Sequence, residues 1–90
     1  MELAGPNPFV SQAAFRLQSD ENLRNVGATI HGVDGSLVQV LFVGATFPVG
    51  DHHFSWNGED SRSRRVPRGV YFLRLAADGK VVTKKLVRLR

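Results

Sequence analysis

The sequence predicts an all-β fold, an antiparallel β-sandwich of about seven short strands. Three observations lead to this prediction. Apolar side chains recur with a period of two, turn residues recur about every ten positions, and no helical period of useful length is present. With 90 residues, of which 42% are hydrophobic, the chain has the size of one domain with a thin core, so a large catalytic cleft is not expected.

The first two full strands are each expected to have one apolar face. Residues 13–18 place Phe15 and Leu17 on that face and polar side chains on the other. Residues 26–31 repeat the pattern, with Ile30 on the apolar face. Such alternation is typical of a strand that covers a core on one side and meets solvent on the other.

Two Asp-Gly dipeptides, at positions 34–35 and 78–79, mark hairpin turns. This dipeptide readily supplies the positive φ angles that a tight two-residue turn requires. The first turn precedes an apolar strand over residues 36–42, and the second separates strands expected over residues 70–77 and 80–89.

A further strand is expected to carry His52, Phe54 and Trp56 on its inward face. Because Trp56 shares a strand face with Phe54, the indole is expected to pack in the core rather than to stack against a sugar. The same reasoning on every strand predicts a core that comprises Phe15, Leu17, Val26, Ala28, Ile30, Val38, Val40, Phe54, Trp56, Tyr71, Leu73, Leu75, Val81 and Val87.

The last strand is expected to separate apolar from basic side chains by parity. The inward set comprises Val81, Thr83, Val87 and Leu89. The outward set, a row of cations suited to an acidic receptor groove, comprises Lys84, Arg88 and Arg90.

Charge is distributed unevenly along the chain. Residues 1–61 carry seven acidic and two basic side chains, whereas residues 62–90 carry one acidic and ten basic side chains. Two interpretations follow. The charges form solvated outer faces and edge-strand lysines that keep the domain soluble, or they form a basic surface that meets an anionic partner.

No catalytic, cofactor-binding or metal-binding residue is assigned. The chain has no cysteine, and it lacks the glycine-rich phosphate loops, the nucleophile elbow and the HExxH zinc pattern. His52 and His53 are adjacent on an expected strand and therefore point to opposite faces, which disfavours a shared metal site.

The segment between two expected strands, residues 57–68, is polar and basic. Its first half offers oxygen ligands for calcium from Asn57, Glu59, Asp60 and Ser61, but only two of these are carboxylates. Such residues commonly close a turn, so a structural turn is expected and calcium is the alternative. The arginines that follow come without exposed aromatic side chains that would stack bases, so nucleic acid is not an expected partner.

Four stretches of the chain carry a resemblance to a known family: PNPF (6–9), ATIHGVDGSLVQVL (28–41), FPVGDHHFSWNGEDSRSRRVPRGVYFLRL (47–75) and KKLVRLR (84–90). They resemble the C-terminal sorting domain of the bacterial type IX secretion system, also called the Por secretion system sorting domain. That family is related to the Ig-like domain of the flagellar hook-cap protein, the FlgD-like domain. The most specific part runs from residue 56 to residue 72, where a polar glycine turn precedes Arg-Arg-Val-Pro-Arg-Gly-Val-Tyr-Phe.

The chain departs from the family pattern in the polar turn. Where the family usually reads Trp-Asp-Gly, this chain has Asn57 between the tryptophan and the glycine. The later Asp-Ser-Gly of the family is replaced here by Ser-Arg-Ser at positions 61–63. Both departures weaken the calcium interpretation and leave the expected fold unchanged.

The resemblance implies an Ig-like β-sandwich that acts as an address and not as an enzyme. Residues 1–8 would be the end of an interdomain linker, and residues 9–90 a C-terminal sorting signal. This signal would direct a secreted bacterial protein through the periplasm and across the outer membrane to the cell surface. The implied partners are the outer-membrane secretion machinery, a sorting peptidase, the N-terminal cargo domain of the parent chain and anionic lipopolysaccharide. No cofactor is implied.

The side chains expected to contribute to partner recognition are basic and come from two segments. They are Lys84, Lys85, Arg88 and Arg90 in the last strand, and Arg62, Arg64, Arg65 and Arg68 in the polar segment. Two other functions stay open. One is an Ig-like spacer or hook-cap-like scaffold module, and the other is an accessory carbohydrate-binding module of a glycosidase, which requires an exposed aromatic platform.

Overall fold

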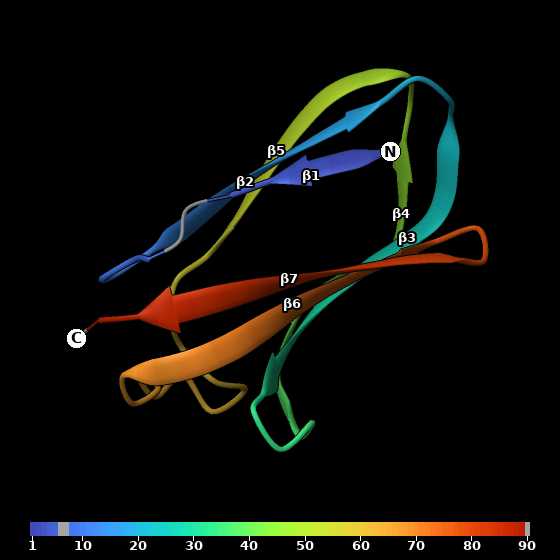
Figure 1. Ribbon diagram of the computed structural model, residues 1–90. Coiled ribbons are helices and arrows are strands. Elements are labelled where there is room, and N and C mark those ends of the chain that lie inside the picture. The colour runs from blue at the N-terminus through green and yellow to red at the C-terminus, as the bar shows by residue number, and fades with distance from the viewer. Residues whose placement is uncertain (6–7, 90) are drawn as a thin grey trace.

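The computed structural model describes residues 1–5 and 8–89, and within them the chain forms seven strands and no helix. The strands are β1 (Glu2–Ala4), β2 (Ala13–Ser19), β3 (Leu23–Gly32), β4 (Leu37–Phe47), β5 (Gly50–Trp56), β6 (Gly69–Ala77) and β7 (Lys80–Arg88). They pair into two antiparallel sheets, in the orders β1-β2-β5 and β4-β3-β6-β7, which form the two layers seen in Figure 1. The predicted β-sandwich of about seven strands is confirmed. In the described part of the chain, no helix is long and apolar enough to cross a membrane.

The smaller sheet is built on the strict alternation of β2. Every second side chain of β2 is buried and the others are exposed, as the sequence predicts. β5 pairs along the whole of β2, with Phe15 opposite Phe54 and Ala13 opposite Trp56. The rings of Phe15 and Phe54 stack at a centroid distance of 5.2 Å. The small Ala13 leaves room for the large indole, so the two sheets close over one continuous core.

The larger sheet has β3 and β6 at its centre, and these two strands carry most of the core. β3 contributes the fully buried Val26 and Ile30, and β6 contributes the fully buried Leu73 and Leu75. The chain changes sheet between β2 and β3, between β4 and β5 and between β5 and β6, so neither sheet is formed by consecutive strands alone.

The hairpin predicted at positions 78–79 is confirmed. Asp78 and Gly79 both have positive φ, at 48° and 80°, and they place Ala77 opposite Lys80. The turn at positions 34–35 also connects β3 to β4, but the connection is longer, over residues 33–36, with a positive φ of 86° at Gly35. The strand that follows it, β4, is longer than predicted because it continues to Phe47.

Most of the predicted core is buried, and the differences come from edge strands and loops. Val40 is 43% exposed and Val81 is exposed as well, whereas Val38, Phe54 and Val87 are half-buried. The buried apolar side chains that the prediction left out are Phe9, Ala13, Leu23, Val66, Ala77 and Leu86.

The predicted parity of the last strand is wrong. Residues opposite each other in an antiparallel pair face the same side of the sheet. Because Val82 lies opposite the buried Leu75, the even-numbered residues of β7 face the core and the odd-numbered ones face outward. Leu86 is therefore fully buried, and Leu89 is exposed.

The outward row of cations does not form for the same reason. Arg88 is only 5% exposed, and Lys84 lies half-buried opposite Leu73. Of the two lysines at positions 84 and 85, Lys85 faces solvent, opposite Phe72. The third member of the predicted row, Arg90, lies outside the described residues.

The N-terminal segment contributes to both sheets, although residues 1–8 were expected to be a linker. Glu2–Ala4 form β1, which pairs with β2. Phe9 then lies alongside β7, where its N–H donates to Val87 O at 2.9 Å and its carbonyl accepts from Leu89 N at 2.9 Å. The buried ring of Phe9 packs against Trp56 at a centroid distance of 5.6 Å. The folded domain thus begins before Phe9.

Trp56→Ala should lower the free energy of unfolding by about 3–5 kcal/mol, because the fully buried indole would leave a cavity between the two sheets. Urea denaturation followed by far-UV circular dichroism measures the change. Val33→Ala is the control, because Val33 is exposed in a turn and its loss should change stability by less than about 0.5 kcal/mol. Equal stability of the two variants would contradict the placement of Trp56.

Candidate functional site

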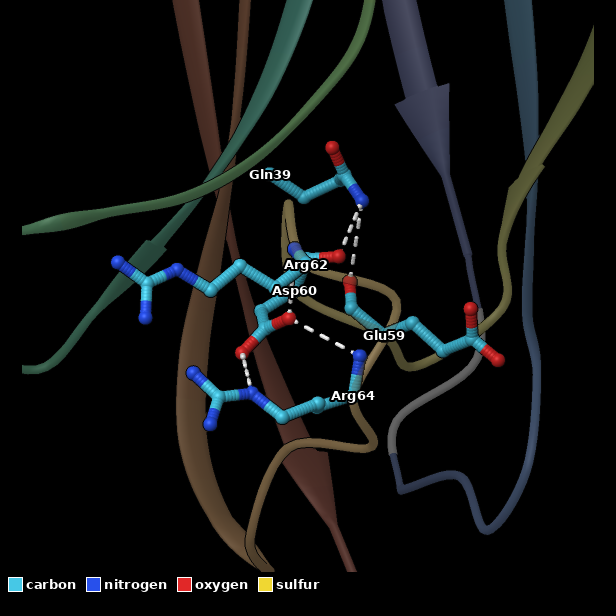
Figure 2. A network of polar contacts seen from close by, with 5 residues as sticks. All are labelled: Gln39, Glu59, Asp60, Arg62 and Arg64. Carbon is cyan, nitrogen blue, oxygen red and sulfur yellow. Dashed lines mark hydrogen bonds and ion pairs between the residues drawn. The ribbon is translucent and has the colours of Figure 1, made fainter.

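The longest irregular segment between two strands of the sandwich connects β5 to β6 and carries four arginines. We call residues 57–68 the arginine loop. In Figure 2 its polar groups converge on the backbone and carboxylate of Asp60. These contacts decide whether the loop is a ligand site or a structural turn.

The first turn of the loop is built on Trp56. The indole Nε1 donates to Glu59 O at 2.9 Å. The N–H of the buried ring is thus satisfied by a carbonyl of the loop, which turns back over the indole. Asn57 Oδ1 accepts from Glu59 N at 3.1 Å. Gly58 is buried with a φ of 77°, and its carbonyl accepts from Val66 N at 3.0 Å.

Asp60 closes the second turn. Its Oδ1 accepts from the backbone N–H groups of Arg62 at 2.9 Å and Arg64 at 3.0 Å, and its own N–H donates to Arg64 O at 2.8 Å. The bonds from Arg64 and Arg62 hold the pKa of the Asp60 carboxyl below its usual value. The oxygens considered as calcium ligands at Asn57 and Asp60 thus accept hydrogen bonds from the loop backbone.

The loop also covers part of the free edge of β4. Ser61 N donates to Val38 O at 3.0 Å, and the Gln39 amide donates to Asp60 O at 2.8 Å (Figure 2). Val40 N donates to Gln39 Oε1 at 3.1 Å. Unpaired groups on an edge strand invite pairing with other chains. The loop and Gln39 therefore protect the first residues of β4.

A buried arginine links the loop to β7. Arg88 Nη1 donates to Gly58 O at 3.3 Å beneath the loop. Burial lowers the pKa of the Arg88 guanidinium, and nearby Arg65 lowers it further. A side chain so enclosed contributes to the architecture of the loop and offers little surface to a partner.

Tyr71 secures the end of the loop. Its hydroxyl donates to Pro67 O at 2.6 Å, and its ring packs edge-on against Trp56 at 5.5 Å. Burial raises the pKa of the Tyr71 hydroxyl above its usual value. A tyrosine that bonds to the backbone a few residues upstream is a known corner device of immunoglobulin-like sandwiches. The Val-Pro-Arg-Gly-Val-Tyr succession carried that signal in the sequence.

The structure gathers only part of the predicted recognition set. Arg62, Arg64, Arg65 and Arg68 are all exposed on the arginine loop. The basic residues of β7 do not join them on one surface, because Lys84 and Lys85 point to opposite faces of the sheet. Their role in recognition stays a prediction.

A hollow of about 300 Å³ lies between the arginine loop and the start of β4. It is lined by Leu37, Val38, Asp60, Ser61, Arg62, Arg64, Arg65, Val66, Pro67 and Tyr71. The sequence did not indicate this hollow, because it depends on how the loop packs on a strand about 20 residues earlier.

Other possible sites have a structural explanation. His52 stacks on Phe47 at a ring distance of 4.7 Å, whereas the adjacent His53 is exposed on the other face, as the sequence predicted. Among residues 1–5 and 8–89, no three histidine, aspartate or glutamate side chains gather in a way that could hold a metal ion.

The sequence matches the family of the FlgD Ig-like domain over residues 7–80, most of its length. The chain belongs to this family. The fold is also similar to the crystal structure of FlgD from P. aeruginosa, with a TM-score of 0.56 and 23% identity over 83% of this chain. The chain spans 56% of that structure, a little over half its length. No curated protein matches the sequence.

The family assignment supports the hook-cap-related part of the resemblance seen in the sequence. An Ig-like β-sandwich of the FlgD type is confirmed by the family match and by the seven-stranded fold. The assignment to type IX sorting stays a prediction.

Gly58→Ala should destabilise the domain by about 1–2 kcal/mol more than Gly35→Ala does. Both glycines have positive φ, so each alanine adopts a strained backbone conformation. The added methyl group at Gly35 meets nothing within 4 Å, whereas at Gly58 it overlaps the Arg88 guanidinium. Thermal melts of the two variants measure the difference, and equal melting temperatures would contradict the packing of Arg88 beneath the loop.

Proposed function

We propose that this domain is a non-catalytic structural module of a longer protein, an Ig-like spacer or scaffold unit of the FlgD type. The observation that carries the proposal is the family match over residues 7–80. The backbone of the arginine loop and the Asp60 carboxylate are consistent with it, because their polar groups bond to the domain itself.

The placement of the first and last strands suits a spacer. In Figure 1, β1 begins toward one end of the sandwich and β7 ends at the other, along a molecule whose longest extent is 36 Å. A module with this geometry holds two neighbours apart in series. We expect the module to be stiff, because the two sheets share one continuous, closely packed core.

A domain exchange tests the spacer role in the full-length parent protein. Replacement of residues 1–90 by an unrelated Ig-like sandwich of similar length should preserve the parent's assembly and activity, because a spacer acts through its length and stiffness. Deletion of the same residues should impair both. A replaced protein that behaves like the deletion would contradict the proposal, since specific surface residues would then be required.

A second candidate is the type IX sorting signal, and one observation favours it. The succession from residue 56 to residue 72 forms a single rigid unit in which Trp56, Gly58 and Tyr71 hold the loop. This is the stretch in which the resemblance to the sorting domains is most specific. Under this proposal the domain passes through the periplasm, is recognised by the outer-membrane machinery and a sorting peptidase, and leaves its cargo at the cell surface on lipopolysaccharide.

A reporter fusion tests the sorting role. A signal peptide, a fluorescent reporter and residues 1–90 are expressed in a bacterium with the type IX machinery, and an unrelated Ig-like sandwich replaces residues 1–90 in the control. The sorting proposal expects reporter on the cell surface, accessible to added protease, for this domain alone. Retention of both fusions in the periplasm would count against sorting and leave the spacer proposal in place.

The carbohydrate-binding alternative is not proposed. It requires an exposed aromatic platform, and Trp56 is only 1% exposed in the core. The other aromatic side chains, the six phenylalanines and Tyr71, are all buried or half-buried. The interpretation of Trp56 as a core residue is confirmed.

A further inference from the structure

We propose that the hollow between the arginine loop and the start of β4 is a docking surface for an acidic extended segment of a partner protein. Such a segment would place one branched apolar side chain in the hollow and flanking carboxylates on the arginines. This docking surface does not depend on the spacer or sorting role.

Part of the lining of the hollow is apolar and accessible. Leu37 is 58% exposed at the first position of β4, and Val66 and Pro67 line the hollow from the loop. A volume of about 300 Å³ is at the lower end of ligand pockets and accommodates one or two side chains. An apolar side chain that enters it would remove Leu37 from water, which is favourable in proportion to the area covered.

The rim of the hollow is positively charged. Figure 2 shows the Arg62 and Arg64 side chains extending from the same side of the loop, whereas the Glu59 carboxylate extends from the opposite side. The nearest acidic group, Asp60, lies 3.9 Å from Arg64 Nε, and the Arg64 side chain is 67% exposed. An exposed pair at this distance is weak, so the guanidinium groups are available to a carboxylate from outside.

The loop holds its arginines on a fixed backbone. Asp60 binds the N–H groups of residues 62 and 64, and Ser61 anchors the loop to β4. Little entropy is therefore lost in ordering the loop backbone when a partner binds. Because these N–H groups already have an acceptor, an anion is recognised by the guanidinium groups, which suit the planar, two-oxygen geometry of carboxylates.

The same features favour an acidic peptide over other anions. Nucleic-acid surfaces combine arginines with exposed aromatic rings that stack bases, and every phenylalanine, tyrosine and tryptophan ring here is buried or half-buried. An anionic membrane or lipopolysaccharide surface calls for a broad cationic face. Here the loop arginines line a small hollow that they share with a few apolar side chains, and Lys84 and Lys85 lie on opposite faces of β7.

The test is an NMR titration of the ¹⁵N-labelled domain with the capped peptide Glu-Glu-Leu-Glu-Glu. Amide shifts are expected at residues 37, 38 and 62–66, with an affinity that falls as salt is raised from about 50 to 300 mM. The peptide Glu-Glu-Ala-Glu-Glu should bind several-fold more weakly, because it lacks the side chain that fills the hollow. Shifts elsewhere, or equal affinity for both peptides, would overturn the proposal.

A double variant tests the rim. Arg62→Gln with Arg64→Gln should weaken binding by about tenfold while keeping the melting temperature, because the backbone N–H groups of these residues hold the loop and the exposed ion pair of Arg64 with Asp60 is weak. The matched control, Arg74→Gln with Lys85→Gln, removes two exposed charges from β6 and β7 and should change affinity less than twofold.

Two further measurements complete the design. Arg62→Lys with Arg64→Lys keeps the charge and should recover only part of the affinity, since lysine lacks the bidentate geometry. Vesicles of phosphatidylglycerol and a twelve-nucleotide oligothymidine are titrated as competing anions. Equal weakening in the two glutamine variants, or tighter binding of vesicles or oligonucleotide at the loop, would refute an acidic peptide as the partner.

Discussion

The packing of one indole is the constraint on which the rest of this domain depends. Trp56 ends β5 in the smaller sheet, yet its ring lies against Phe9 and Tyr71, which belong to or border the larger sheet. A buried indole also needs a hydrogen-bond acceptor for its N–H. A backbone carbonyl a few residues later can serve if the chain turns back directly after the tryptophan. The carbonyl of Glu59 provides that acceptor at 2.9 Å. The core and the arginine loop are thus fixed by the same side chain.

The second constraint on the structure is that an open sandwich has strand edges, and these edges must be protected from pairing with other chains. The arginine loop bonds to one edge of the larger sheet at Val38, and Phe9 bonds to the other edge at Val87 and Leu89. The register between β3 and β4 also shifts repeatedly along the pair, and such bulges twist an edge away from regular pairing. The polar composition of the loop therefore has a structural reason. The bonds that hold the loop come from its backbone and from the Asp60 carboxylate, and the guanidinium groups of Arg62 and Arg64 contribute little to them.

The sequence predicted the fold well where local rules decide the structure. The alternation of β2 and the Asp-Gly turn before β7 were both interpreted correctly, because period and turn chemistry act over a few residues. The direction in which the side chains of β7 face was predicted incorrectly. The two-residue turn and the inward Leu75 together require Val82 to face inward. Apolar residues occur on both parities of that strand, so its own pattern was ambiguous. The hollow could not be predicted, because it depends on long-range packing of the loop on β4.

The bond between Arg88 and Gly58 connects residues 30 positions apart, and this spacing has a consequence for how the domain is made. During synthesis the arginine loop is made before β7. Until Arg88 follows, the carbonyl of Gly58 lacks the guanidinium that donates to it in the folded domain. Contacts between residues far apart in the sequence form later in folding than local ones. A domain arrested before β7 would carry the loop's arginines without their final geometry. A partner that reads the ordered loop would therefore recognise only fully folded copies, which would make the loop a checkpoint for completed folding.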